Sequence, residues 1–137
     1  MVLVDTSIWI EFFRAKPTVF LPSLDLLILE REIATCLVIY AEICSGQMKK
    51  GVKSLVSSAF QSMYFIDEDW SMRSARDMIS DMAQKAYQEN IPACGIVDRM
   101  IVLSAKKNNL PLWSLDQKMI QLAKSQGVTI FRPSEVP

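Results

Sequence analysis

The chain has 137 residues, half of them hydrophobic, and its 15 basic and 15 acidic residues give a formal net charge of zero. These values fit one compact domain over residues 1–137, and they exclude a disordered chain or a strong polyanion binder acting through bulk charge. No apolar run approaches the roughly 20 residues of a membrane-spanning helix, and the N-terminus lacks a basic signal region, so we expect a cytoplasmic protein.

Short apolar runs alternate with helical patterns along the chain, which predicts an α/β fold with a mainly parallel sheet. Asp67 is expected to cap a long helix whose apolar face runs from Met72 to Ala86. Pro92 and Gly95 separate that helix from the next one. In chain order, the pattern predicts strands at 2–4, 33–36, 63–66, 112–114 and 129–131, and further helices at 6–14, 21–30, 38–45, 52–62, 96–107 and 116–125.

The sequence contains no histidine. This absence excludes Ser-His-Asp and Cys-His catalysis, two-histidine ribonuclease chemistry and histidine-ligated zinc. Hard divalent cations held by oxygen ligands remain compatible with the composition. The three cysteines, Cys36, Cys44 and Cys94, are odd in number and widely spaced, which favours buried thiols over a disulfide framework or a zinc ribbon.

Four acidic residues, Asp5, Glu42, Asp98 and Asp116, lie within or directly after apolar segments that look built to be buried. A buried carboxylate is costly unless it is paired, hydrogen-bonded or bound to metal. Asp5 and Asp116 follow predicted strands at their carboxyl ends, and Asp98 lies near a helix start, which faces the same edge of the sheet. The sequence therefore predicts that these three acids meet at one rim, as in a carboxylate metal site for phosphodiester chemistry.

Each acid also has a structural explanation. Asp5 is suited to cap the helix that follows it, and residues 114–117 match a capping box with Ser114 as the cap. Asp98 is favoured by the dipole of its own helix. Glu42 has no basic residue three or four positions away, so its partner is either a distant Lys or Arg or a metal ion.

The four acids lie in four short motifs that follow one another along the chain. Val-Leu-Val-Asp-Thr-Ser-Ile-Trp-Ile occupies residues 2–10, Ala-Glu-Ile 41–43, Gly-Ile-Val-Asp 95–98 and Leu-Trp-Ser-Leu-Asp 112–116. In this order and at these spacings they resemble the motifs of the PIN-domain nucleases, in particular the VapC-type toxin ribonucleases of toxin–antitoxin pairs. There are two departures: Ser114 stands where Thr is more usual, and Arg99-Met100 where small or apolar residues are more usual.

The resemblance implies a PIN-like three-layer α/β/α fold with a mainly parallel, five-stranded sheet in the order 3-2-1-4-5, so that the first and fourth strands are neighbours. It also implies Mg²⁺ or Mn²⁺, a homodimer, and an antitoxin that covers the active site. Under this interpretation Asp5 and Asp98 are the best direct or water-mediated metal ligands, with Glu42 and Asp116 completing the shell, in part through water.

Hydroxyl and basic side chains would assist the four acids. The hydroxyls belong to Thr6, Ser7 and Ser114, of which Ser7 and Ser114 are suited to orient the water or the acids. Because the net charge is zero, RNA would have to be held by local groups. The candidates are Lys49, Lys50 and Lys53 in one cluster, and Arg99, Lys106, Lys107 and Lys118, which we expect near the rim.

Other interpretations stay open on the sequence alone. They include a PIN nuclease with a housekeeping RNA-processing role, a receiver-like regulatory module that binds Mg²⁺, and a purely structural α/β binding module. The receiver-like module normally has an acidic pair after its first strand, whereas Val4 precedes Asp5 here. The segment 21–29 is apolar nearly all round, so it belongs either to the core or to an interface with an antitoxin or a second copy.

Overall fold

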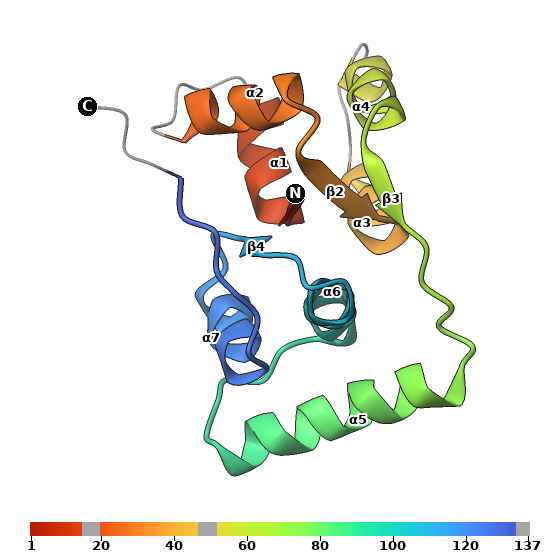
Figure 1. Cartoon of the computed structure of the whole chain (residues 1–137), viewed down its shortest axis with the longest axis vertical. Coiled ribbons are helices and arrows are strands. Elements are labelled where there is room, and N and C mark those ends of the chain that lie inside the picture. The colour runs from red at the N-terminus through yellow and green to blue at the C-terminus, as the bar shows by residue number, and fades with distance from the viewer. Residues whose placement is uncertain (15–19, 47–51, 134–137) are drawn as a thin grey trace.

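A computed structural model describes residues 1–14, 20–46 and 52–133 of the chain (Figure 1). Its centre is a parallel sheet in the order β3-β2-β1-β4, which confirms the order expected for these strands. The strands are β1 (Val2–Val4), β2 (Ile33–Cys36), β3 (Tyr64–Ile66) and β4 (Leu112–Trp113).

The helices form a layer on each side of the sheet. Helices α1 to α4 connect β1 to β2 and β2 to β3 on one side, while α5 to α7 lie on the other (Figure 1). The change of side follows from the return past β1 to β4, because crossovers between parallel strands are right-handed. The helices are α1 (Thr6–Phe13), α2 (Leu21–Leu29), α3 (Leu37–Ser45), α4 (Val52–Gln61), α5 (Arg73–Gln88), α6 (Ile96–Lys107) and α7 (Gln117–Ser125).

The central strands are buried on both faces. Leu3, Val4, Ala34 and Leu112 have no exposed surface, since helices cover each side of the sheet. This explains why these strands are continuous apolar runs rather than alternating ones. Among the described helices none has the length and apolar character needed to cross a membrane. Cys36, Cys44 and Cys94 are free thiols, as predicted, but only Cys36 is fully buried and the other two are half-buried.

The fifth strand expected at 129–131 is reduced to a single parallel bridge between Ile130 and Leu112. It lies on the outer side of β4, where the expected order puts a fifth strand. Leu112 N–H donates to the Thr129 carbonyl at 2.9 Å, and Phe131 N–H donates to the Leu112 carbonyl at 2.9 Å. The pairing is limited to this bridge because β4 is only two residues long and Leu112 alone turns its N–H and C=O towards residues 129–131.

Two predicted helix starts were wrong. Helix α5 begins at Arg73, with Met72 as its N-cap, and not after Asp67. Between these positions Asp69 accepts a hydrogen bond from Ser71 N–H at 3.0 Å, which forms a local turn in place of helix. Helix α7 is capped by Asp116 itself rather than by Ser114.

Candidate active site

Asp5 lies at the carboxyl end of β1 and is only 3% exposed. The pairing of β1 with β4 aligns Val4 with Trp113, and Asp5 N–H donates to the Trp113 carbonyl at 2.9 Å. This register brings the residues after both strands side by side, so Ser114 reaches Asp5 although the two are far apart in sequence. The predicted neighbourhood of the first and fourth strands is thus confirmed.

The Asp5 carboxylate is held through one of its two oxygens. Ser7 Oγ donates to Oδ2 at 2.8 Å, Ser114 Oγ donates to it at 2.7 Å, and Ser7 N–H reaches it at 3.4 Å. Within the described residues, none of the hydrogen bonds found reaches Oδ1. The carboxylate is therefore oriented through Oδ2, while Oδ1 keeps its capacity to bind a cation or a water molecule.

The two serine hydroxyls that hold Asp5 are themselves fixed. Ser7 Oγ accepts from Leu115 N–H at 3.0 Å, and Ser114 Oγ accepts from Asp116 N–H at 3.0 Å. Their oxygens lie 3.4 Å apart. Because each hydroxyl accepts from backbone, its own proton is directed at Asp5. The supporting role predicted for these serines fits this geometry.

Glu42 accepts a hydrogen bond from Thr6 Oγ1 at 2.6 Å. In the described residues this partner takes the place of the distant Lys or Arg that the sequence suggested as one alternative. Thr6 lies in the first turn of α1 and Glu42 in the middle of α3, and the two helices pack together. Only the unusual run of three oxygen side chains from Asp5 to Ser7 pointed towards Thr6 in the sequence.

Asp98 lies in the first turn of α6 and is half-buried. Its pKa is raised above the ordinary value, first by loss of solvent and then by the charges of Asp116, Asp5 and Glu42. A backbone hydrogen bond at Gly95 opposes this rise only in part. The repulsion arises because all four acids share the rim at the carboxyl ends of β1 and β4.

Asp116 joins the rim while it caps α7. Its Oδ1 accepts from Lys118 N–H at 2.9 Å and from Met119 N–H at 3.4 Å. The sequence suggested a helix cap in this segment, and the start of α7 is capped as expected. The capping residue is Asp116 rather than Ser114. The charge of Asp116 still reaches Asp98, where it is the largest electrostatic contribution to the raised pKa.

The expectation that all four acids are buried was wrong. Asp5 is buried, Asp98 and Asp116 are half-buried, and Glu42 is exposed. Ile39 and Ile43 pack one face of α3 on the core, while Glu42 lies at the exposed border of that face, where it meets Thr6. The rim is therefore open to solvent at Glu42.

The rim fits a hydrated hard cation better than a fully dehydrated one. In the part of the chain that the structure describes, no three acidic or cysteine side chains converge closely enough to form a ready-made metal cluster. Mg²⁺ usually retains several waters and binds through one or two carboxylates plus the substrate, so a loose set of carboxylates suits it. Asp5, with its free Oδ1, and Asp98, where negative charge is crowded, are the residues best suited to hold such an ion.

The basic residues predicted to contact RNA divide into three groups. Burial and the charges of Asp98 and Asp116 raise the pKa of the Cys94 thiol, and the charges of Lys118 and Arg99 oppose this rise, so both basic residues lie near this end of α6. Arg99 Nη1 donates to the Ile79 carbonyl of α5 at 3.3 Å, so its guanidinium is already engaged there. Lys53 is exposed on α4, and Lys49 and Lys50 lie outside the described residues.

Two further lysines, Lys106 and Lys107, make contacts with other side chains of the protein. Lys106 donates to Gln126 Oε1 at 3.1 Å and Lys107 pairs with Glu68 at 2.8 Å. They lie about 12 Å from Asp98 along α6, given a rise of about 1.5 Å per residue. The suggestion that they lie near the rim was wrong.

The family model of the PIN domain matches residues 2–125, and the chain belongs to this family. PIN domains are nucleases and generally use divalent metal ions. The matched range includes all four acids of the rim. No curated protein sequence matches the chain significantly.

Solved structures share the fold over nearly the whole chain. The FitAcB crystal structure from Neisseria gonorrhoeae is 19% identical, covering 99% of this chain and 100% of that one, with a TM-score of 0.71. The VapBC2 structure from Rickettsia felis, bound to a DNA fragment from its promoter, is 17% identical, covering 96% and 98%, with a TM-score of 0.72. PAE2754 from Pyrobaculum aerophilum is 15% identical, covering 90% and 86%, with a TM-score of 0.59. Identities this low establish the fold alone.

Proposed function

We propose that this PIN domain is a metal-dependent endoribonuclease that acts as the toxin of a toxin–antitoxin pair. The observation that carries the proposal is the meeting of Asp5, Glu42, Asp98 and Asp116 at the carboxyl edge of the sheet, around a carboxylate held on one side by hydroxyls. The absence of histidine leaves these acids as the groups through which phosphodiester hydrolysis would proceed.

In this mechanism each residue has a defined task. Asp5 and Asp98 would hold Mg²⁺ or Mn²⁺, with Glu42 and Asp116 completing the set of acids, in part through water. When bound, the ion would neutralise charge on the phosphate and lower the pKa of the nucleophilic water. Ser7 and Ser114 keep Asp5 in one orientation, so that little reorganisation is needed when the substrate arrives.

Thr6 has the corresponding task for Glu42. Its 2.6 Å hydrogen bond fixes an otherwise exposed and mobile side chain at the edge of the rim. Lys118 is exposed and is the basic residue best placed to contact the RNA backbone beside the acids; Arg99 belongs to the same proposal, although it is half-buried and donates to the Ile79 carbonyl. Lys53 belongs to the same proposal but lies on α4, further along the surface.

The partner surface of the proposed toxin lies on α2. Leu26 is 53% exposed and Leu29 is 80% exposed, whereas Leu24 on the same helix is fully buried. Aliphatic side chains this exposed on a short helix are typical of an interaction surface. We assign this face to the antitoxin and expect the nuclease itself to be a homodimer.

The first test is cleavage of a mixed RNA pool by the wild-type protein and Asp5→Asn in Mg²⁺, Mn²⁺ or EDTA. Asparagine keeps the shape and the helix cap but removes the charge. Cleavage by the wild type only, and only with metal, is the expected result. If neither protein cleaves RNA under any condition, and metal leaves thermal unfolding unchanged, the acids are structural and the nuclease proposal fails.

A second test separates a toxin from a housekeeping nuclease. A small protein encoded beside this gene should bind the chain and stop cleavage, and Leu29→Asp should weaken that binding without changing cleavage. Tyr87→Asp is the matched control, because Tyr87 is equally exposed but lies on α5. Cleavage that no neighbouring gene product inhibits would point to the housekeeping role.

A further inference from the structure

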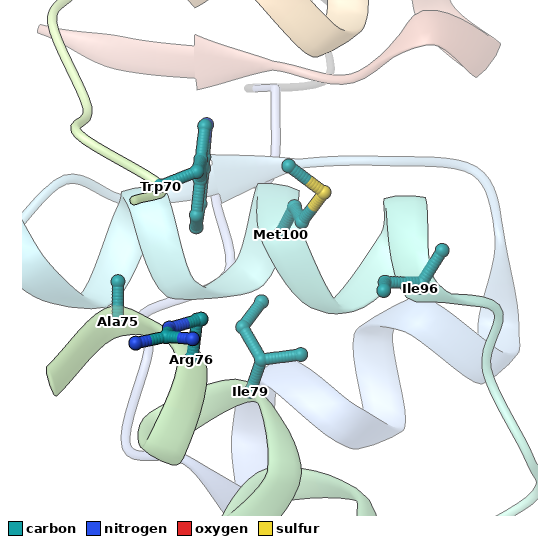
Figure 2. Close-up of a pocket in the computed structure, with 6 residues that line it drawn as sticks. All are labelled: Trp70, Ala75, Arg76, Ile79, Ile96 and Met100. Carbon is teal, nitrogen blue, oxygen red and sulfur yellow. The ribbon is translucent and has the colours of Figure 1, made fainter. Parts of the chain in front are cut away.

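An open pocket of about 240 Å³ lies between α5 and α6, across α6 from the acidic rim, and has no role in the proposed mechanism (Figure 2). Helices α5 and α6 and the loop between β3 and α5 form its walls. In Figure 2, Trp70 and Arg76 lie at one end, Ile96 lies at the other and Met100 lies between them. The lining residues are Trp70, Ala75, Arg76, Ile79, Ile96 and Met100.

The lining combines an indole ring, a guanidinium group and aliphatic or thioether surface. A purely apolar ligand would gain nothing from Arg76, and a free anion would gain nothing from Trp70, Ile79 or Met100. A nucleotide would use both kinds of group. Its base stacks on aromatic rings and on arginine planes, and its phosphate attracts the positive charge. The volume is small for a drug-sized ligand but suits one ring system.

The pocket and the rim share helix α6. Ile96 and Met100, which line the pocket, are each two residues from Asp98, so they lie about 3 Å from it along the helix axis but about 160° round the helix, on the opposite side of α6. A strand with a phosphate at Asp98 would reach the pocket by passing round the start of α6, where Ile96 is exposed. Single-stranded RNA has unstacked bases free to enter such a pocket.

We propose that this pocket binds one base of single-stranded RNA whose strand passes round the start of α6 from the cleaved phosphate, with Trp70 as the stacking platform. The inference rests on the proposed nuclease function and adds to it a specificity-determining subsite. Trp70 and Arg76 are positioning residues, because they touch the substrate away from the reacting atoms. The small pocket selects the nucleotide at one position near the cut.

The tryptophans of this chain give a direct readout of base binding. Trp9 and Trp113 are 0% and 2% exposed, whereas Trp70 is only half-buried. A base that stacks in the pocket should therefore quench the emission of Trp70 alone. The titration uses Asp5→Asn in EDTA, so that binding is measured without cleavage, with six-residue oligomers of A, C, G or U as probes.

At least one oligomer should quench the emission, and Trp70→Phe should abolish the quenching while it keeps the affinity for labelled RNA. Trp70→Ala should weaken the affinity about tenfold, within the range known for the loss of one stacking aromatic. Arg76→Ala should weaken it too, whereas Arg73→Ala should not. Arg73 is the matched control because it removes the same charge from the same turn of α5 but does not line the pocket.

Failure of the base pocket and failure of the nuclease give different results. If wild-type protein cleaves RNA but Trp70→Ala and Arg76→Ala bind and cut at the same positions as the wild type, the pocket inference is wrong and the nuclease stands. If an oligomer quenches Trp70 but no RNA is cleaved in Mg²⁺ or Mn²⁺, the base pocket stands and the nuclease proposal fails. If Trp70→Ala changes the oligomeric state and not RNA affinity, the pocket is a protein interface and the inference is overturned.

Discussion

Replacing Asp98 by asparagine should stabilise the metal-free protein at neutral pH. Its carboxylate is partly removed from water and faces the charges of Asp116, Asp5 and Glu42, which raises its pKa. An acid with a raised pKa in the folded state binds protons more readily than it does in the unfolded chain. The stabilisation that comes from protonated Asp98 is therefore fully present below the pKa of this carboxyl in the unfolded chain. It is lost as the pH rises through the higher pKa of the same carboxyl in the folded protein.

The size of the effect is limited by solvent. Asp98 is only half-buried, so water screens much of the repulsion, and we expect a gain of at most about 1 kcal/mol for Asp98→Asn at pH 7. For a domain of this length that corresponds to roughly 3–5 °C in the melting temperature. Near pH 3, below the usual pKa of about 3.9 for Asp, the advantage should disappear.

The assay is thermal unfolding in EDTA at pH 7 and at pH 3, with Asp25→Asn as the control. Asp25 is an exposed acid on α2, so its neutralisation removes one charge without touching the rim. With Mg²⁺ present the order should reverse, because the wild-type protein gains stability from metal and Asp98→Asn loses a ligand. An unchanged or lower melting temperature of Asp98→Asn at pH 7 in EDTA would refute the electrostatic account of the rim.

Three further outcomes are expected. Asp5→Asn should abolish cleavage and the Mg²⁺-induced rise in melting temperature measured by calorimetry, while circular dichroism shows an unchanged fold. A melting temperature that still rises with Mg²⁺ would contradict the assignment of Asp5 as a metal ligand. Ser114→Ala should destabilise the protein by about 1–2 kcal/mol in denaturant titrations. The change leaves Asp116 N–H without its acceptor and removes a buried hydrogen bond to Asp5. An unchanged unfolding midpoint would show that water replaces the hydroxyl. Thr6→Val should lower kcat with little change in stability, because Glu42 is exposed and loses only its tether; equal kcat in both proteins would make the contact incidental.

Much of the site could be predicted from sequence because its residues follow local rules. Asp5 and Asp116 come directly after apolar runs, and Asp98 follows a break in the chain, so the alternation of strands and helices was enough to place them at one edge of the sheet. Helix α6 was predicted with its observed bounds for the same reason: its apolar positions recur at helical spacing and Gly95 marks its start. Periodicity and helix caps involve residues a few positions apart, and these can be read along the chain.

Contacts between distant segments were decided only by the tertiary structure. Thr6 and Glu42 are 36 positions apart, and Ser7 and Ser114 are 107 positions apart. No pattern along the chain pairs them, because their meeting depends on how helices pack and on the register of β1 with β4. The exposure of Glu42 has the same origin: an apolar neighbourhood in sequence does not state which face of a helix meets the core.

The fifth strand and the pocket also separate what the sequence predicts from what packing decides. The sequence predicted a strand at 129–131, but the length of β4 limits its pairing to a single bridge. Trp70 lies in an irregular loop, and its position over α6 depends on where α5 begins and how α5 packs. The identity and order of the four acids were thus determined by the sequence, whereas the hydroxyls that orient them, their exposure and the pocket across α6 from them arise from packing between segments that sequence spacing does not relate.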